Sequence, residues 1–480
     1  MYDVAVIGAG IIGVSIARAL AQCTLTVIVI EKDNDVANEA TMANSGIIYN
    51  GYNAKQDKLK GAFTFRGNLL YEELCRELDV PFKRAGMVVA AFEEEGMEKV
   101  RELFKKAVQN GTPHSCLLTP EEVMAIEPNI SKNVAGAFYS PECGIVSPWE
   151  LTFALAENAI ENGVEFRLGA EVTDVMKTND TFRIIANQKE IQASCVINCA
   201  GMYADKINNM VDEPQFKIKP KKGQYFVLDK RADQFVNNIV SRQKTETEKG
   251  FMMIPTVDGN LLIGPLNDDA EDKESKKTSL ETLHKLKRLA ASTFDNLPLG
   301  QVIRSFSGLK AKADVEDFFI QESKQAPGFI NVAGINSPGL TCAPAIAEHV
   351  REMVKTVFVN RGVAVAANKD FNPVRKKGVS FRALPLAEQN KLIAANPQYG
   401  SIVCRCEMVT EGEIVEAIHR KPGATTVKGV KKRTRAGMGR CQGGFCSSRV
   451  VRILARELQV SLENVVYDEK NSYIVAKRVE

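Results

Sequence analysis

The first 13 residues, MYDVAVIGAGIIG, place a short β-branched run directly before the pattern GxGxxG. Residues 4–7 predict a strand and residues 14–20 a helix, with Gly8, Gly10 and Gly13 between them. The glycines give a tight turn, let the backbone approach a pyrophosphate, and allow the helix to pack closely on the strand. The helix N-terminus then presents unpaired N–H groups to the phosphates.

A second predicted strand, residues 25–30, ends at an acid, Glu31, which stands 18 positions after Gly13. An acid at this distance hydrogen-bonds the ribose hydroxyls of a bound dinucleotide. The pattern GxGxxG alone also fits an ordinary strand, turn and helix. Set between two strands and followed by Glu31, it indicates a dinucleotide site.

Three later segments favour FAD over NAD as that dinucleotide. Residues 39–52, EATMANSGIIYNGY, are polar and rich in small residues, so the backbone there can approach a flat ring closely. Residues 195–205, CVINCAGMYAD, predict a buried strand and a glycine turn. Residues 328–354 predict a strand, a Gly/Ser/Pro loop and a helix from near Leu340. The N-terminus of that helix would stabilise negative charge on a reduced flavin.

Two cysteine pairs stand near the end of the chain. Cys404 and Cys406 form a CxC pair, and after 34 further residues Cys441 and Cys446 follow in RCQGGFC. Each pair precedes a predicted helix, and residues 410–413, TEGE, fit a capping box. Four thiolates suit either a tetrahedral zinc or an iron–sulfur cluster. The CxC spacing and the upstream redox domain favour the cluster.

The composition limits the remaining choices. At about 150 residues per domain, 480 residues suggest roughly three domains. No cleavable leader and no apolar stretch of about 18 residues is evident, so we expect a cytoplasmic protein without a membrane span. In that compartment the 11 cysteines stay reduced, which favours metal binding for those that cluster.

One local basic run, KKRTR at residues 431–435, departs from the nearly balanced net charge of +3. We interpret it as a solvated basic face. The functional alternative is that it offsets an anionic cluster or docks a partner. No aromatic residues are interleaved with it, so we expect no nucleic-acid partner.

The quoted motifs VIGAGIIG, ANSGII, NCAGMYAD and NVAGINSPGL together resemble the FAD-dependent D-amino-acid-oxidase-like superfamily. Within it, the sequence is most similar to the glycerol-3-phosphate dehydrogenase and L-2-hydroxyglutarate oxidase branch. The resemblance covers residues 1 to about 360 and implies an α/β fold. A Rossmann-like FAD domain would stand beside a substrate domain with an antiparallel sheet.

The segment VCRCEMVTEGEI, with TRAGMGRCQGGFC after it, resembles the bacterioferritin-associated-ferredoxin-like 2Fe–2S domain over residues 400–460. This resemblance implies a small helical domain in which Cys404, Cys406, Cys441 and Cys446 bind a 2Fe–2S cluster. Taken together, the two resemblances imply the following organisation. The FAD domain comprises residues 1–80, 145–215 and 325–360, the substrate domain 81–144 and 216–324, the linker 361–399, the cluster domain 400–460, and a C-terminal tail 461–480.

The resemblance also implies a set of FAD-binding residues from separate parts of the chain. They are Gly8, Gly10, Gly13, Glu31, Lys32, Asn44, Ser45, Gly46, Val172, Ala200, Gly201, Gly334, Asn336, Gly339, Leu340 and Thr341. The other seven cysteines and the four histidines lie outside these motifs, and we assign none of them to catalysis.

Two candidate substrate residues depart from the branch. Tyr49 stands where relatives usually have a His, and Lys310 stands where they have an Arg. Tyr is a poor base at neutral pH, and Lys lacks the bidentate fork of Arg. Arg304 is a candidate to compensate on the same strand. Less firm candidates are Lys222, Tyr225 and Asp258, the last of which also fits an ordinary hairpin residue.

These features predict a FAD-dependent dehydrogenase that oxidises a small anionic hydroxy compound, glycerol 3-phosphate or a 2-hydroxy acid. Electrons would pass through the 2Fe–2S cluster to a second flavoprotein or a quinone-linked subunit. One alternative is an amino- or imino-acid dehydrogenase. Another is an electron-relay subunit whose substrate site is degenerate.

Overall fold

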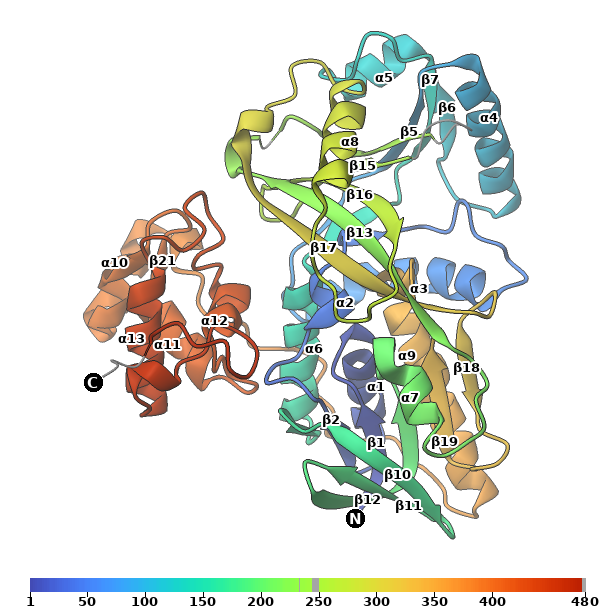
Figure 1. Cartoon of the computed structure of the whole chain (residues 1–480), viewed down its shortest axis with the longest axis vertical. Helices are drawn as coiled ribbons and strands as arrows, with labels where there is room; N and C mark the ends of the chain where they lie inside the picture. The colour runs from blue at the N-terminus through green and yellow to red at the C-terminus, as the bar shows by residue number, and fades with distance from the viewer. Residues whose placement is uncertain (233, 244–249, 477–480) are drawn as a thin grey trace.

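The computed structural model describes residues 1–232, 234–243 and 250–476 (Figure 1). A unit with a largely parallel sheet carries the N-terminus, and an antiparallel sheet stands above it. The last part of the chain forms a small helical unit at their side. The predicted α/β class with a helical C-terminal region is confirmed.

The lower sheet has the order β10-β11-β12-β1-β2-β9, with β19 beside β12 and β18 beside β19. Its strands are β1 (Tyr2–Ile7), β2 (Val27–Ile30), β9 (Glu165–Arg167), β10 (Val172–Thr178), β11 (Thr181–Ala186), β12 (Lys189–Asn198), β18 (Phe319–Glu322) and β19 (Phe329–Ala333). The strands β9, β2, β1, β12 and β19 run parallel. Their sequences are nearly all apolar because both faces are covered, as VIVI in β2 and FINVA in β19 illustrate.

Four helices from distant parts of the sequence share one core against this sheet. They are α1 (Ile11–Ala21), α3 (Leu59–Glu77), α6 (Pro148–Glu161) and α9 (Gly339–Asn360). The short helix α7 (Ala204–Asn208) contributes Ile207 to a second apolar cluster with β10 and β11. The lower unit is therefore assembled from segments of the chain that the upper unit interrupts.

The upper sheet has the order β17-β13-β16-β15-β14-β5-β7-β6 and is antiparallel except between β14 and β5. Its strands are β5 (Met87–Ala91), β6 (Cys116–Leu118), β7 (Gly136–Ser140), β13 (Ile218–Leu228), β14 (Ile239–Arg242), β15 (Met252–Pro255), β16 (Leu261–Asp269) and β17 (Val302–Ala313). The helices α4 (Glu94–Gln109), α5 (Pro120–Ile126) and α8 (Leu280–Ala291) accompany it. The long strands β13 and β17 reach down to the lower unit (Figure 1).

The junction of the two units holds a small sheet and a short helix. The sheet has the order β3-β8-β4 and consists of β3 (Ile47–Ile48), β4 (Phe82–Arg84) and β8 (Gly144–Val146). The helix α2 (Glu39–Met42) contacts β17 directly. The polar segment of residues 39–52 therefore lies between the two main sheets.

The C-terminal unit has its own apolar core of buried residues that includes Ile414, Val430 and Leu454. Its elements are α10 (Leu386–Ala395), β20 (Ile402–Cys404), β21 (Val409–Thr410), α11 (Glu411–His419), α12 (Val427–Thr434) and α13 (Ser447–Leu458). The predicted capping box is confirmed, because Thr410 accepts from the backbone N–H of Glu413 and the Glu413 side chain accepts in return.

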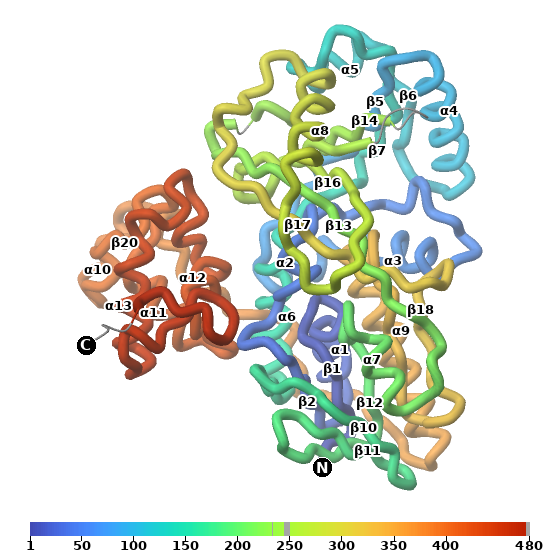
Figure 2. The backbone as a smooth tube through the Cα atoms, viewed as in Figure 1, coloured from blue at the N-terminus to red at the C-terminus, as the bar shows by residue number. Residues whose placement is uncertain are grey.

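The segment between α9 and α10 runs along the lower unit, as the tube in Figure 2 shows. The backbone N–H of Asn368 donates to the carbonyl of Gln22, and that of Arg375 to the carbonyl of Glu77. The tail after α13 also returns to the lower unit, where Asn34 hydrogen-bonds the carbonyl of Asp468. Backbone contacts at residues 368 and 375 thus hold the first part of the linker against the lower unit.

The basic run 431–435 is not a solvated face, contrary to our first interpretation. Arg433 binds both oxygens of Asp35 at 2.7 Å, and its guanidinium lies 4.0 Å from the ring centre of Phe153. Lys432 donates to Asn38 at 2.7 Å and lies 3.3 Å from Asp35. The side chains of Lys432, Arg433 and Asp35 are at most 5% exposed. The run therefore docks the C-terminal unit on the loop that follows β2.

Further ion pairs join the same units. Arg420 of the C-terminal unit and Arg375 of the linker both bind Glu157 of α6 at 2.6 Å. Arg435 binds Asp258 of the upper unit at 2.5 Å. Asp258 therefore takes part in docking the C-terminal unit. Each contact joins residues that are far apart in sequence.

The charges on Asp35 make this docking dependent on pH. Burial alone would raise the pKa of Asp35, but the charges and hydrogen bonds of Arg433 and Lys432 outweigh it and hold the pKa below its ordinary value. The stabilisation is therefore present above the ordinary pKa of about 4 and is lost as pH falls through the depressed pKa.

We predict that Asp35→Ala loosens the C-terminal unit, because two buried cations lose their carboxylate. Removal of one partner from a buried pair costs about 3–5 kcal/mol. Cleavage by a protease within linker residues 361–399, followed by mass spectrometry, should become at least about tenfold faster. Asp57→Ala, at an exposed aspartate, is the matched control. Equal cleavage rates in wild type and Asp35→Ala would contradict this role.

Candidate active site and metal centre

The glycines after β1 make contacts that no larger residue could make. A Cβ on Gly8 would collide with the carbonyl of Cys199, and Gly8 has φ +105°. A Cβ on Gly13 would collide with the carbonyl of Gly8. The helix α1 starts after Gly10, so its first N–H groups face the turn. These contacts fit the close packing that a pyrophosphate site requires.

Glu31 ends β2 beside that turn. Its carboxylate accepts from the backbone N–H of Ala9 at 2.6 Å and from that of Asp33 at 2.9 Å. Burial and the nearby Asp33 raise its pKa to about 7, although both amide hydrogen bonds act in the opposite direction. A buried carboxylate at this position is suited to accept hydrogen bonds from ribose hydroxyls.

Two further predicted residues surround this end of the site. Lys32 pairs with Asp33 at 2.9 Å and lies 5.7 Å from the ring centre of Tyr203. Val172 packs in an apolar cluster with Ile30. Both therefore stand beside the C-terminal end of β2, where an adenosine group would bind.

Thr41, which we did not predict, contacts the start of α1 from the helix α2. Its Oγ1 accepts from the backbone N–H of Ile11 at 3.0 Å, at the start of α1. A hydroxyl here competes for the same N–H groups that bind phosphate. Thr41 stands in the polar segment EATMANSG, which we expected near the flavin. The sequence does not show, however, that α2 folds back on α1.

The segment after α2 meets the start of α9. Asn44 accepts from the backbone N–H of Gly46 at 2.8 Å. Thr341 accepts from the backbone N–H of Tyr49 at 3.0 Å, and the Tyr71 hydroxyl donates to the carbonyl of Leu340 at 2.5 Å. Residues 44–49 and 339–341 were predicted from separate motifs, and the structure brings them together.

The remaining predicted FAD residues lie at the ends of parallel strands. The backbone N–H of Ala200, which precedes Gly201, donates to Asn198 at the end of β12. Gly334 follows β19 with φ +67° and packs against Ala313 of β17. Asn336 and Gly339 then form the turn into α9, with Gly339 N–H donating to the Asn336 carbonyl.

The lower face of β13 and β17 covers this region. A Cβ on Gly308 would collide with the carbonyl of Ala43, so β17 approaches the segment after α2 by backbone contact. Tyr225 is stacked on Phe306 of β17 with ring centres 4.7 Å apart and is hydrogen-bonded to Ser45. Tyr225 and Ser45 therefore connect the upper sheet to the predicted flavin segment.

Tyr49 lies in an apolar setting close to Tyr225. Its hydroxyl is 3.8 Å from the sulfur of Met252. Burial raises the pKa of both Tyr49 and Tyr225 well above the ordinary value. Both hydroxyls therefore stay protonated at neutral pH and act as hydrogen-bond donors, not as bases.

Lys310 lies on the same face of β17 as Phe306 and Gly308. Its Nζ donates to Asn267 at 2.9 Å. The strand register places Lys221 of β13 directly opposite Lys310. Like charges directly opposite on a sheet are destabilising. Asp269 of β16 lies 3.5 Å from the Nζ of Lys221 and offsets part of this repulsion. Lys310 is therefore the stronger candidate anchor for an anion.

Two other candidates point elsewhere. Arg304 reaches Gln442 at 3.4 Å, in the loop between Cys441 and Cys446. Lys222 lies on the opposite face of β13 from Tyr225 and donates to Ser275 and to the carbonyl of Lys277. Neither side chain contacts the Tyr49 region through these bonds.

The four cysteines converge in two pairs. The sulfurs of Cys406 and Cys441 lie 3.8 Å apart. The hydrogen bond from Cys446, with the backbone amides of Gly437, Glu407 and Cys406, lowers the pKa of Cys404 to about 6. A lowered thiol pKa favours the thiolate that binds metal, whereas the same hydrogen bond raises the pKa of Cys446.

Backbone amides surround the second pair as well. The amides of Phe445, Gly443 and Gly444 lower the pKa of Cys441. A Cβ on Gly439 would collide with the Cβ of Cys406, so only glycine fits there. Glycines and amides close to the sulfurs suit an iron–sulfur cluster.

The arrangement in two pairs matches a 2Fe–2S cluster, which takes two thiolates at each of two irons. The other cysteines lie apart from these loops, and burial raises the pKa of Cys195 to about 12.

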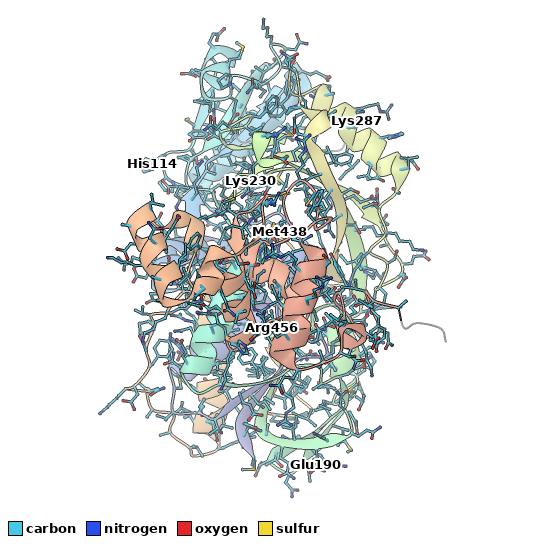
Figure 3. The ribbon with its side chains drawn as sticks, turned by 90° about the vertical axis from the view of Figure 1, so that its left-hand side faces the viewer. His114, Glu190, Lys230, Lys287, Met438 and Arg456 are labelled. Carbon is cyan, nitrogen blue, oxygen red and sulfur yellow. The ribbon has the colours of Figure 1, made fainter. Side chains whose placement is uncertain are left out.

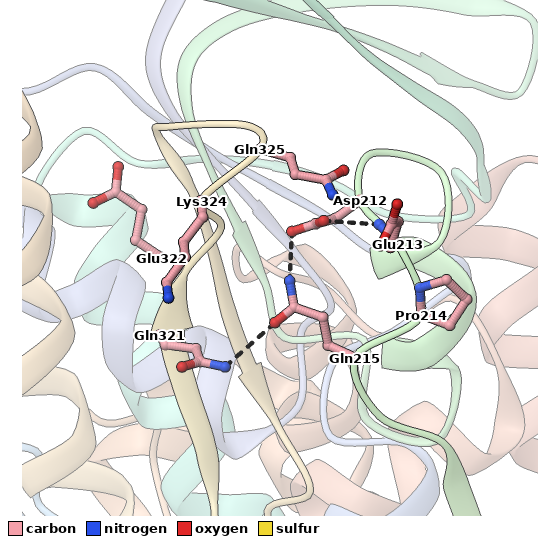
Figure 4. Close-up of a pocket in the computed structure, with 8 residues that line it drawn as sticks. All are labelled: Asp212, Glu213, Pro214, Gln215, Gln321, Glu322, Lys324 and Gln325. Carbon is pink, nitrogen blue, oxygen red and sulfur yellow. Dashed lines mark hydrogen bonds between the residues drawn. The ribbon is translucent and has the colours of Figure 1, made fainter.

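A further cavity of about 340 Å³ lies between the loop after α7 and the loop joining β18 to β19 (Figure 4). Its polar groups bond to one another: Gln215 donates to Asp212, and Gln321 donates to Gln215. None of the predicted site residues lines it. It is therefore separate from the candidate active site.

Comparison with known families assigns both parts of the chain. Residues 3–353 match the model of the FAD-dependent oxidoreductase family, and residues 402–456 match the BFD-like [2Fe-2S] binding domain. A glycerol 3-phosphate dehydrogenase of Caloramator mitchellensis is 48% identical over 475 residues, covering 99% of this chain and 98% of that protein. An L-2-hydroxyglutarate dehydrogenase of Escherichia coli is 32% identical over 271 residues, covering 55% of this chain and 64% of that protein.

A solved structure of L-α-glycerophosphate oxidase from Mycoplasma pneumoniae, with FAD bound, superposes with a TM-score of 0.73. It is 26% identical, and the match covers 79% of this chain and 99% of that one. The chain therefore belongs to the FAD-dependent oxidoreductase family. It is an enzyme that uses FAD and carries a 2Fe–2S domain, as the sequence predicted.

We predict that FAD binds more tightly as pH rises, because the ribose hydroxyls bind the ionised form of Glu31. With a pKa of about 7, only about a tenth of the free protein is ionised at pH ~6, against most of it at pH ~8. The Kd for FAD, measured by fluorescence titration, should fall about tenfold between these pH values. In Glu31→Gln the Kd should be higher and nearly independent of pH. An unchanged pH profile in Glu31→Gln would refute the assignment.

We also predict that Gly439→Ala prevents cluster assembly, because the added methyl group would displace Cys406. Iron and acid-labile sulfide, measured on purified protein, should fall well below the wild-type content. Gly300→Ala, at a glycine with open space around it, should keep the full content. A fully loaded Gly439→Ala protein would show that Cys406 is not a ligand held at this spacing.

Proposed function

We propose that this chain is a glycerol-3-phosphate dehydrogenase that passes electrons through its cluster to a protein acceptor. The observation that carries the proposal is the 48% identity to a glycerol 3-phosphate dehydrogenase over 99% of this chain. That likeness runs through the flavin part, the linker and the cluster part alike. Bound FAD supplies the two-electron acceptor for substrate oxidation.

The paired lysines support an anionic substrate. Lys221 and Lys310 face each other across β13 and β17, and Asn267 beside them offers a further polar group. A phosphate beside Lys310 would gain a charge-assisted hydrogen bond from its ammonium group. Lys221, which is also paired with Asp269 at 3.5 Å, would add a weaker attraction. Lys310 is thus the proposed phosphate anchor, with Lys221 as its support.

The two tyrosines support orientation of the substrate. Tyr49 is fixed through its backbone to Thr341 at the start of α9, and Tyr225 is held by Phe306 and Ser45. Their protonated hydroxyls can donate to substrate oxygens while Met252 helps to exclude water. Neither removes a proton from the substrate at neutral pH, so that proton leaves through another group or through water.

A 2-hydroxy acid is the second candidate substrate. The relative that suggests it is the L-2-hydroxyglutarate dehydrogenase, which matches over 55% of this chain. A carboxylate could bind the same lysines as a phosphate. An imino-acid substrate and a relay role with a degenerate substrate site remain as outcomes of the test below.

The contact between Arg304 and Gln442 supports transfer from flavin to cluster. Arg304 touches the loop that carries two of the four cysteines. Gly308, which packs against the segment after α2, follows four residues later on the same strand, or ~13 Å away. A single strand thus borders both the candidate flavin site and the cluster loops.

The electron acceptor would be a separate protein, a second flavoprotein or a quinone-linked subunit. No helix in the described ranges is long and apolar enough to cross a membrane. We also propose a cytoplasmic location, since 11 cysteines without a disulfide among the described residues suit a reducing compartment.

We predict that glycerol 3-phosphate bleaches the flavin absorbance when mixed anaerobically with the loaded enzyme. Lys310→Met should raise KM for glycerol 3-phosphate roughly 10- to 100-fold with a smaller effect on kcat, since a hydrogen bond to a charged group contributes about 1.5–3 kcal/mol. Lys222→Met, on the opposite face of β13, is the matched control and should leave KM nearly unchanged.

Other results would redirect the assignment. Bleaching by L-2-hydroxyglutarate but not by glycerol 3-phosphate would select the 2-hydroxy acid. Bleaching by proline or another amino acid would select the amine reaction. No bleaching by any of these substrates would support the relay role and refute the dehydrogenase.

A further inference from the structure

One edge of the cluster site is open to solvent. Cys404 and Cys446 are buried, whereas Cys406 is exposed. Phe445, which precedes Cys446, is 86% exposed, and Met408, two residues after Cys406, is 49% exposed. Phe445 is the most exposed of the large apolar side chains that the structure describes. An aromatic ring held in water next to a metal ligand is typical of a surface that another protein covers.

A cavity of about 240 Å³ opens next to this edge, between the upper unit and the cluster loops. Figure 3 looks onto this side of the molecule, with Lys230 above Met438. The cavity is lined by Asp229, Lys230, Arg231, Asn260, Ile303, Cys406, Glu407, Gly439 and Arg440. It therefore touches one of the four cluster cysteines directly.

The positive charges that line the cavity are only partly paired with carboxylates. Asp229 accepts from the backbone N–H of Arg231. Glu407 is buried and binds Lys230 at 2.7 Å and Arg435 at 3.0 Å. In the described part of the chain, the guanidinium groups of Arg231 and Arg440 contact no carboxylate. Both residues are exposed, so the cavity offers two uncompensated positive charges.

We propose that this edge is the docking site for an acidic one-electron carrier protein. Phe445 and Met408 supply the apolar centre of the contact, and Arg231 and Arg440 bind a carboxylate of the carrier in the cavity. Complementary charge would steer the encounter and fix its orientation. This inference rests on the proposed electron transfer and identifies the surface through which electrons leave the protein.

The number of electrons released per substrate molecule determines how many times a carrier must dock. Each docking event transfers one electron outward, so the oxidised carrier is reduced by one electron. Two docking events remove the two electrons that one substrate molecule supplies.

The test measures binding, with no substrate present. The probes are rubredoxin, a small acidic one-electron carrier, and cytochrome c, a basic one of similar size. Loaded full-length protein should bind rubredoxin saturably in calorimetry at about 20 mM salt and bind cytochrome c much more weakly. The Kd for rubredoxin should rise steeply towards about 0.5 M salt, where exposed charges are screened.

Variants locate the surface. Arg231→Glu combined with Arg440→Glu should raise the Kd for rubredoxin at least tenfold, and Phe445→Ser should also raise it. Arg231→Glu alone lies outside the cluster loops and should raise the Kd severalfold, so the test stands even if Arg440→Glu loses its cluster. Arg288→Glu on α8, an exposed arginine distant from the cluster, is the matched control. Iron content and the visible spectrum are compared in every variant.

Several results would overturn the proposal. These are no saturable binding of rubredoxin, equal binding of cytochrome c, or equal binding by Arg231→Glu and wild type. Binding of anionic lipid vesicles through the same residues, without rubredoxin binding, would assign the surface to a membrane instead. Because no substrate is used, a failure of glycerol 3-phosphate oxidation would leave this result standing, and the converse also holds.

Discussion

A carboxylate shared between two cations holds the cluster unit in place. Asp35 is buried between Lys432 and Arg433 of α12, and the guanidinium of Arg433 also lies over Phe153 of α6. Such a group of charges is stable only when all its members are present, because each ion has given up its water. Asp35 stands four residues after Glu31, on the loop that follows β2 at the candidate nucleotide site. The candidate flavin site and the docking of the cluster unit therefore involve the same short segment.

The other contacts that join the cluster unit to the rest of the protein are also ion pairs. Glu157 binds two arginines from the linker and the cluster unit, and Arg435 joins Asp258 of the upper sheet to Glu407 beside Cys406. Charged contacts of fixed geometry specify one orientation more strictly than an apolar contact of equal area. The long strand β17 completes this arrangement, since it covers the segment after α2 and also touches the cluster loop. These contacts thus connect the candidate substrate residues to the cysteine loops.

The local features of this protein could be predicted from the sequence. The glycine turn, the capping box at Thr410 and the four cysteines each depend on residues that are close in sequence or that carry a fixed spacing. The basic run 431–435, Arg304 and Asp258 were misjudged or left open because their partners lie far away along the chain. Thr41 was missed for the same reason, since its contact with Ile11 requires α2 to fold back on α1. A charged residue alone does not reveal whether its partner is water or a distant carboxylate.

Freeze-quench EPR during a single turnover tests most directly whether the docking of the cluster unit connects substrate oxidation to the cluster. Loaded wild-type enzyme and Asp35→Ala would be mixed anaerobically with glycerol 3-phosphate, and the signal of the reduced cluster compared with the loss of flavin absorbance. We expect the cluster signal to appear within the same turnover in wild type, and to appear at least about tenfold more slowly in Asp35→Ala at equal flavin bleaching. A wild-type cluster that stays oxidised while the flavin is bleached, or identical rates in the two proteins, would contradict this connection.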